Sequence, residues 1–200
     1  MAVPTSGNAV TAAEKLSIDF TYALHKLSKC LYIYIGETEQ CGLGIFAAKP
    51  FFAGENIVVD EDGDYYDRAL TFAEVQDRGY DIGRDCIQVG ADLYNLPNGN
   101  LDDIMNHSCD PSTGLRLTPA GYRIVALRDL APGDELTYDY STYISGGRET
   151  LICRCGAAQC RGLIGSFVGL PAALQQRYLR LQVVGEFAAQ PMPEAVASSA

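Results

Sequence analysis

Near the middle of the chain stands Ile104-Met105-Asn106-His107-Ser108-Cys109-Asp110-Pro111. After an apolar approach it presents an amide, an imidazole and a thiol, and Pro111 ends any helix or central strand. Asn106 offers two donors and an acceptor, and His107 offers two ring nitrogens. Taken alone, the run fits a polar turn around a buried histidine as well as it fits a binding site. Two later stretches decide between these interpretations.

The two later stretches add a strand and a cluster of thiols. Gly133-Asp-Glu-Leu-Thr-Tyr-Asp-Tyr140 is typical of a turn that leads into a strand, here Leu136–Tyr140. Cys153, Cys155 and Cys160 follow within eight residues. Tetrahedral structural zinc takes four Cys or His ligands, so a fourth ligand must come from elsewhere in the fold, and Cys109 is the natural candidate. Unrelated reduced thiols are the alternative.

Composition limits the class of protein. The 200 residues suit one domain with short appendages, and 20 Gly with 9 Pro indicate a loop-rich, mainly β chain. The net charge of −10 without a basic stripe argues against direct nucleic-acid binding. It favours a basic, lysine-bearing protein partner, although acidity that serves solubility alone explains it equally well. We see no secretory signal and no membrane-spanning run, so we expect an intracellular protein whose seven cysteines are reduced.

Hydrophobic patterning predicts many short strands and few helices. An N-terminal extension, residues 1–29, is frayed at first and then helical over Ala13–Leu27. Further elements are expected as strands at 31–35, 57–59, 86–90 and 92–94, a helix at 70–78, a hairpin of 115–117 with 122–127, and a helix at 172–184.

Four stretches together resemble the SET-domain protein lysine methyltransferases with a post-SET zinc motif. They stand in family order as Gly42-Leu-Gly44, Asn106 to Ser112, Gly133 to Tyr140, and Cys153 to Cys160. The resemblance places a SET domain at 30–145, a post-SET zinc segment at 146–168, and a C-terminal helix with a disordered tail at 169–200. The pre-SET region of many histone-directed members is absent, so the layout resembles compact bacterial or viral members.

The resemblance implies a mainly β fold, the SET-domain β-clip with a knot-like core, short helices and a C-terminal helix. Tyr140 matches the catalytic tyrosine, and Tyr138 matches the position that governs how many methyl groups are added. The implied zinc ligands are Cys109, Cys153, Cys155 and Cys160. The implied cofactor is S-adenosylmethionine, bound near Leu43, Gly44, Ile45, Asn106, His107, Tyr140 and Ile164.

The implied function is S-adenosylmethionine-dependent protein-lysine N-methylation, mainly monomethylation because Tyr and not Phe stands at 138. A lysine amine, with a reference pKa of about 10.4, must lose a proton before its lone pair can attack. An apolar tyrosine-lined channel beside a sulfonium disfavours the ammonium form. The alternative is a catalytically silent SET module that binds a partner protein or a lysine-bearing peptide.

Some features leave the substrate open. Residues 60–100 match the family pattern poorly, and Ser112 replaces the asparagine that often follows the proline. The oligomeric state stays open too. We expect a cytoplasmic protein if the source is bacterial, and a nuclear or chromatin-associated one if it is eukaryotic.

Overall fold

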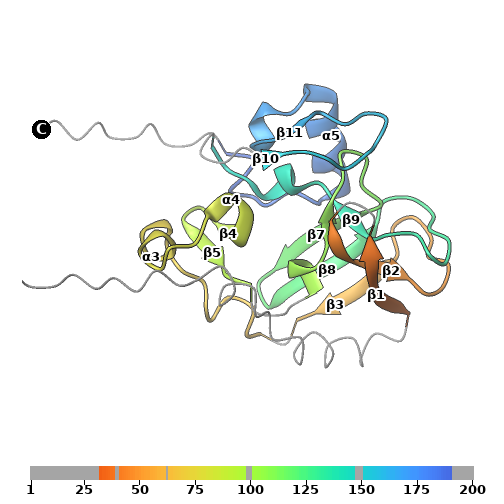
Figure 1. The fold of residues 1–200 in the computed structure, drawn as a ribbon, viewed down its shortest axis with the longest axis horizontal. Helices are drawn as coiled ribbons and strands as arrows, with labels where there is room; N and C mark the ends of the chain where they lie inside the picture. Colours follow the sequence, from red (N-terminus) through yellow and green to blue (C-terminus); the bar gives the residue numbers. More distant parts are fainter. Residues whose placement is uncertain (1–31, 39–40, 62, 98–100, 147–150, 191–200) are drawn as a thin grey trace, which may run out of the picture.

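The computed structural model describes residues 32–38, 41–61, 63–97, 101–146 and 151–190, and the structural statements below concern these residues. Short strands in small sheets make up most of the regular structure, with helices at the periphery (Figure 1). The predicted mainly β fold class is therefore confirmed. The predicted helix Ala13–Leu27, the extension at 1–29 and the tail beyond Gln190 lie outside the described residues.

The largest sheet has three antiparallel strands in the order β3-β8-β7, which are Asn56–Asp60, Gly121–Ala126 and Thr113–Thr118. β7 and β8 form the predicted hairpin, with Thr118 paired to Gly121. A side chain at Gly121 would place its Cβ 2.0 Å from the carbonyl oxygen of Asp60. Only glycine therefore allows β3 to lie this close to the turn.

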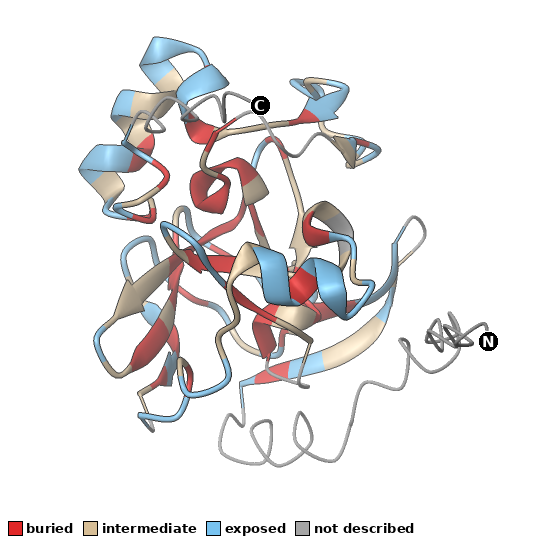
Figure 2. Cartoon of the chain, turned by 90° about the vertical axis from the view of Figure 1, so that its left-hand side faces the viewer, coloured by how far each residue is buried: buried red, intermediate tan, exposed pale blue. Residues whose placement is uncertain are grey.

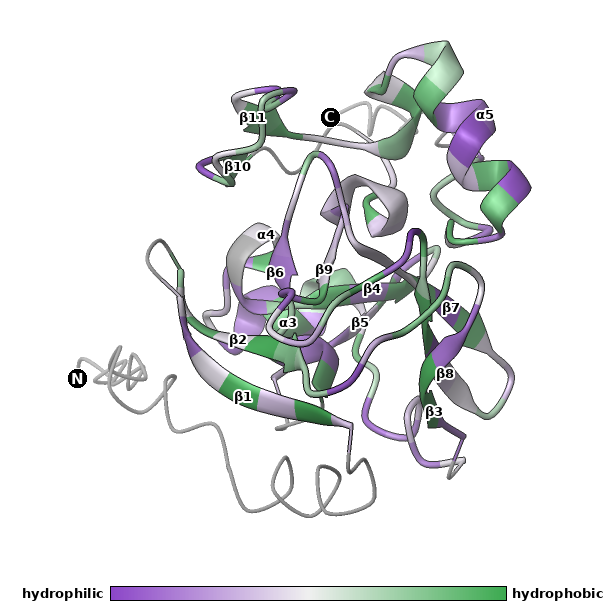
Figure 3. Cartoon of the chain, turned by 90° about the vertical axis from the view of Figure 1, so that its right-hand side faces the viewer, coloured by the Kyte–Doolittle hydropathy of each residue, from purple (hydrophilic) through white to green (hydrophobic). Residues whose placement is uncertain are grey.

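Three further pairs flank this sheet. β1 (Ile33–Thr38) pairs antiparallel with β2 (Gly42–Ala47), β4 (Ile87–Gly90) with β5 (Leu93–Asn95), and β10 (Leu151–Ile152) with β11 (Leu163–Ile164). In Figure 3 the β10–β11 pair and α5 lie together at one end of the molecule, and β1–β2 lies at the other. The segments on either side of the central sheet are thus held mostly by packing, because each pair is too short to be stable alone.

The pair that matters most for the site is parallel. β6 (Asn106–His107) lies beside β9 (Thr137–Tyr138), with Asn106 opposite Thr137 and His107 opposite Tyr138. The predicted strand Leu136–Tyr140 is wrong in extent, since a 3-10 helix, η2 (Tyr140–Tyr143), begins at Tyr140. Asp139 is the reason: its side chain accepts a hydrogen bond from the backbone N–H of Ser141 and caps η2. The knot-like crossing of these segments stays a prediction.

The helices are short. α3 (Phe72–Asp77) begins at a capping box between Thr71 and Glu74, inside the predicted helix at 70–78. α4 (Ile82–Asp85) and η1 (Leu101–Asp103) were not foreseen, because neither is long enough to show periodicity. η3 (Phe167–Gly169) precedes α5.

The C-terminal helix is shorter than predicted. α5 (Ala172–Leu181) ends at Gln182, which has a left-handed conformation with φ of 56°, and not at residue 184. This turn sends Val183 back into the core, against Gly114 of β7, where a Cβ would lie 2.3 Å from a Val183 methyl carbon. The end of α5 is therefore fixed by packing and not by helix propensity.

Two apolar clusters make up most of the core, visible as the buried centre in Figure 2. The larger one fills the space between the central sheet and β1–β2, and its fully buried members include Ile45, Leu115, Ile124 and Leu136. The second lies under α5 around Tyr178 and Phe167. Because β8 contributes Ile124 to one and Val125 to the other, a single strand connects the two clusters.

Candidate active site and metal centre

Two hollows lie near the β6–β9 pair. The first, here called the large cavity, has a volume of about 440 Å³. The second, the tyrosine pocket, has a volume of about 100 Å³. The large cavity is bordered by residues from β1, β2, β6 and the segment around β9, namely Glu37, Thr38, Cys41, Phe46, Asn106, His107, Ser108, Asp110, Arg128, Glu135, Thr137 and Cys155.

Asn106 ties β6 to β2 at the edge of the large cavity. Its amide nitrogen donates to the carbonyl oxygen of Leu43 (2.9 Å) and to the side chain of Glu135 (2.8 Å). A Cβ at Gly44 would lie 2.6 Å from that same Glu135 oxygen, so the close approach requires glycine. Ile45 is 0% exposed and faces the core, so it can offer the cavity only its backbone.

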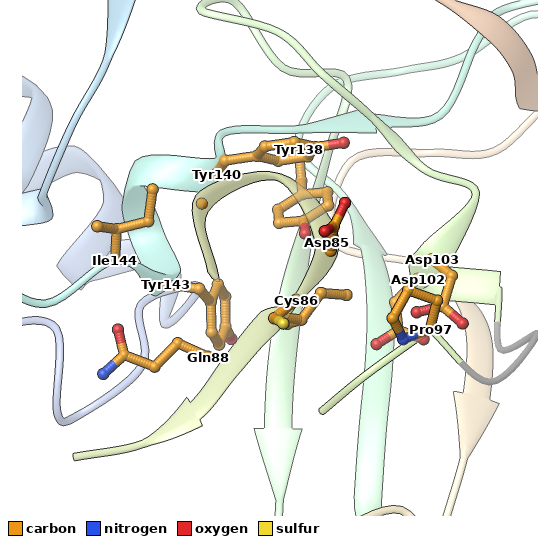
Figure 4. Close-up of a pocket in the computed structure, with 12 residues that line it drawn as sticks. Asp85, Cys86, Gln88, Pro97, Asp102, Asp103, Tyr138, Tyr140, Tyr143 and Ile144 are labelled. Carbon is orange, nitrogen blue, oxygen red and sulfur yellow. The ribbon is translucent and has the colours of Figure 1, made fainter. Parts of the chain in front are cut away.

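The tyrosine pocket lies between η2, β9 and the segment that carries α4 and β4. Figure 4 shows Tyr138 and Tyr140 at one end of it, Asp102 and Asp103 on one side, and Tyr143 on the other. The rings of Tyr138 and Tyr140 have centroids 4.7 Å apart. The poorly matching stretch at residues 60–100 therefore contributes part of the pocket wall.

Tyr140 is held at its backbone N–H and at its hydroxyl. The hydroxyl donates to the carbonyl oxygen of Met105 (2.7 Å), and the backbone N–H donates to Nδ1 of His107 (3.2 Å). Burial raises the pKa of the phenol of Tyr140, and that of Tyr138. Both phenols are therefore neutral at physiological pH. The role of the Met105 carbonyl was missed, because a backbone oxygen leaves no signal in the sequence.

His107 is a neutral imidazole. Burial lowers its pKa to about 4, although the neighbouring Asp139 raises it. A neutral ring has one acceptor nitrogen, and Nδ1 already accepts the N–H of Tyr140. The proton therefore stands on Nε2, which lies 3.3 Å from the sulfur of Cys109 and can donate to it.

The predicted thiols meet in one cluster. The sulfurs of Cys109 and Cys153 are 3.7 Å apart, and those of Cys153 and Cys160 are 3.6 Å apart. Thiolates at about 2.3 Å from a tetrahedral zinc ion stand about 3.8 Å from one another, so these spacings suit zinc. Ligand atoms of His107, Cys109, Cys153 and Cys155 also lie within 4.8 Å of one another. The donor set therefore fits a zinc ion.

The pKa of the Cys155 thiol favours metal binding. Burial opposes ionisation of Cys155, but the N–H groups of Cys109 and Ala157 and the thiols of Cys153 and Cys160 outweigh it and lower the pKa to about 7. A thiolate near neutral pH is the form that binds metal.

Asp139 connects this cluster to the C-terminal helix, and the sequence reasoning missed it. One carboxylate oxygen accepts from Arg161 (2.7 Å), and the other accepts from the hydroxyl of Tyr178 in α5 (3.1 Å). Tyr178 is 0% exposed. Ile164, predicted near the cofactor, is buried with Cys109 and Cys153 in a third apolar cluster that Tyr140 packs against. The C-terminal segment thus packs directly against the residues that hold Tyr140.

Comparison with known proteins identifies the family. The family described as "SET domain" matches residues 42–141, half of the chain. The chain belongs to the SET-domain family. The matched range lies inside the expected 30–145, and the outer domain boundaries stay a prediction.

Several proteins and one solved structure are similar to this chain. "Histone-lysine N-methyltransferase ATX2" of Arabidopsis thaliana is 28% identical over 176 residues, 81% of this chain and 15% of that protein. "Histone-lysine N-methyltransferase 2B" of Homo sapiens is 33% identical over 129 residues, 60% of this chain and 5% of that protein. The chain thus spans only a small part of these relatives. The methyltransferase domain of human SETMAR has a TM-score of 0.49 at 21% identity, over 67% of this chain and 58% of that one.

None of the described helices combines the length and apolar character that a membrane span requires.

The hydrogen bonds of His107 predict the ligand set of the metal centre. We expect one zinc ion per chain, retained in His107→Gln and lost in Cys155→Ser and Cys160→Ser, because His107 uses its single acceptor nitrogen on Tyr140. Metal analysis of the purified variants measures this. X-ray absorption at the zinc edge of the wild type is the second readout, and should give four sulfur neighbours. If the spectrum instead showed three sulfur neighbours and one nitrogen, His107 and not Cys160 would be the fourth zinc ligand.

Proposed function

We propose that this protein is an S-adenosylmethionine-dependent protein-lysine N-methyltransferase. The observation that carries the proposal is the position of Tyr140: its ring lines the tyrosine pocket, while its backbone is bonded to His107, which lines the large cavity. A methyl transfer needs a cofactor and an amine to meet at one point from two sites. The histone-lysine methyltransferase relatives support the same reaction.

The large cavity suits the cofactor by chemistry. S-adenosylmethionine, when bound, supplies a methyl group already activated on a sulfonium. The carboxylates of Glu37 and Glu135 would favour its cationic groups, and Arg128 would favour its carboxylate. The residues proposed to hold it are Leu43, Gly44, Ile45, Asn106, His107, Tyr140 and Ile164, with Ile45 acting through its backbone.

The chain's own residues supply alignment and an environment. The hydroxyl of Tyr140, fixed on the carbonyl of Met105, borders the place where the amine would lie. Because its raised pKa keeps the Tyr140 phenol protonated, this phenol cannot take up the proton of the amine. We propose that the Tyr140 hydroxyl orients the amine and polarises the groups around the amine. The zinc proposed at Cys109, Cys153, Cys155 and Cys160 takes no part in the transfer and holds the C-terminal segment in place.

We propose a lysine in a basic protein segment, such as a histone tail, as the substrate. The relatives named above are histone-lysine methyltransferases, and the chain carries 25 acidic against 15 basic residues. An acidic surface speeds the encounter with a basic segment. The same relatives make chromatin the proposed place of action.

Removing one hydroxyl tests the proposed function. With core histones and methyl-labelled S-adenosylmethionine, the wild type should label lysine, and Tyr140→Phe should lose most turnover, by at least about 100-fold, since an interaction made mainly in the transition state is lost. Cofactor affinity, measured by calorimetry, should change little.

The control separates the two functional hypotheses. If the wild type binds a lysine peptide but transfers no methyl group to any histone or extract protein, the protein is the silent binding module. If Tyr140→Phe kept near wild-type turnover, Tyr140 would not have the proposed catalytic role, and the methyltransferase proposal would still stand.

The number of methyl groups tests Tyr138. Tyr138 is 4% exposed, and its ring narrows the tyrosine pocket beside Tyr140. We propose that the wild type makes mainly monomethyl-lysine, because a water held by the Tyr138 hydroxyl occupies the space a methylated amine would need. Tyr138→Phe should shift the product towards dimethyl-lysine, measured by mass spectrometry of the modified peptide. Mainly trimethyl-lysine from the wild type would contradict the proposal.

A further inference from the structure

Gln88 is a buried amide side chain in the wall of the tyrosine pocket, and the proposed reaction does not account for its polarity. It lies in β4 and is 3% exposed. Its neighbours along the strand, Ile87 and Val89, pack in the larger apolar cluster. Burying an amide costs free energy unless its polar atoms are bonded, so the hydrogen bonds of Gln88 indicate its role.

The amide of Gln88 is bonded at both of its polar atoms. Nε2 donates to the hydroxyl oxygen of Ser145 (2.6 Å) and to the carbonyl oxygen of Gly90 (2.9 Å). Oε1 accepts from the backbone N–H of Ser145 (2.9 Å). Two hydrogen bonds that run in opposite directions thus join residues 57 positions apart in the chain, and we call this pair the Gln88–Ser145 clamp.

The clamp joins two parts of the wall of the tyrosine pocket. One part comes from α4 and β4, and includes Cys86 and Gln88 itself. Another part comes from η2 and the residue after it, and includes Tyr143 and Ile144, which directly precede Ser145. Figure 4 shows the side chain of Gln88 beside Tyr143. A change in the clamp therefore acts on the shape of the pocket.

Apolar packing holds these two parts of the wall less closely than the clamp does. Ile82 of α4 packs with Val75 and Tyr94 in a fourth apolar cluster, whereas Tyr143 belongs to the larger cluster, to which β4 contributes Val89. Hydrophobic contact has no preferred direction, but an N–H···O hydrogen bond keeps its donor and acceptor about 2.7–3.2 Å apart. The clamp therefore fixes how far β4 stands from the end of η2.

We propose that Gln88 and Ser145 are positioning residues that set the width of the tyrosine pocket, and thereby the affinity for the target lysine and the number of methyl groups it receives. They act through Tyr143 and Ile144, whose places the clamp fixes. A pocket of fixed width is preorganised for an unmodified amine and leaves little room for a methylated one. The proposal rests on the proposed function, and adds to it the residues that determine this specificity.

Gln88→Met keeps the length of the side chain and removes every hydrogen bond of the amide. The KM for a core-histone tail peptide should rise by about tenfold, the order expected for one lost buried hydrogen bond. The kcat should change little, because binding is lost equally in the ground state and the transition state. Mass spectrometry should find a larger share of dimethyl-lysine. Affinity for S-adenosylhomocysteine should stay unchanged, since neither residue of the clamp lines the large cavity.

Ser145→Ala gives a second test that does not require the Met variant to fold. It removes the bond to the hydroxyl and leaves the backbone N–H at 145 bonded to Oε1 of Gln88, so the same changes should be smaller. The double variant should have the KM of Gln88→Met alone, because two residues that act through one shared contact are not additive.

The matched control is Gln175→Met in α5. The Gln175 amide also donates two hydrogen bonds to backbone, to the carbonyl oxygens of Leu170 (2.7 Å) and Val168 (3.1 Å), and it does not line the tyrosine pocket. This variant should unfold at a lower temperature with an unchanged KM and product. If Gln88→Met and Ser145→Ala behaved in the same way, Gln88 would have a structural role only, and the proposal would be overturned.

Peptide binding separates this proposal from the proposed function, because it needs no turnover. Calorimetry with the histone-tail peptide, in the presence of S-adenosylhomocysteine, should give weaker binding to Gln88→Met than to the wild type. If that result came without methyl transfer by the wild type, the proposed function would fail and the role of the clamp in lysine binding would stand. Equal binding by the wild type, Gln88→Met and Ser145→Ala would overturn the proposal for the clamp.

Discussion

The parallel contact between β6 and β9 positions Asn106, His107 and Tyr138 relative to one another. Each strand has two residues, and their register sets His107 beside Tyr138. So short a parallel pair has little stability of its own, so its geometry must be held by the groups around it. Asn106 bonds β6 to β2 and Glu135, and the hydroxyls of Ser112 and Thr113 bond to the backbone around β9. Side-chain hydrogen bonds therefore hold these strands in place where a longer pair would use backbone hydrogen bonds.

A second set of bonds connects this pair to the C-terminal segment. Asp139 accepts from Arg161 and Tyr178, and His107 accepts the N–H of Tyr140 while Nε2 faces the sulfur of Cys109. The thiol cluster, α5 and the proposed catalytic tyrosine are thus parts of one network. Because buried polar networks are costly when only partly satisfied, loss of one member should disturb the others. A metal ion at the thiol cluster would therefore be connected to Tyr140 through His107.

The features that could be predicted from the sequence are those that depend on which side chains are present. The three motifs, the cysteine cluster, the hairpin and the β-rich class all depend on residue identity and spacing, and the structure brings Cys109 to Cys153 as expected. What it could not predict depends on backbone atoms or on packing. The carbonyl of Met105 has no signature, β9 ends early because Asp139 caps η2, and α5 ends early because Val183 packs against Gly114. His107 was expected only near the cofactor, and its contact with Cys109 requires the fold.

We propose that the β6–β9 pair and Tyr140 separate a cofactor site from a lysine site. A crystal structure with S-adenosylhomocysteine and a lysine peptide would locate both sites. We expect the nucleoside in the large cavity beside Asn106 and His107, the lysine in the tyrosine pocket, and the Tyr140 hydroxyl at the point where the two meet. Both ligands on the same side of Tyr140, or the cofactor in the tyrosine pocket, would contradict it.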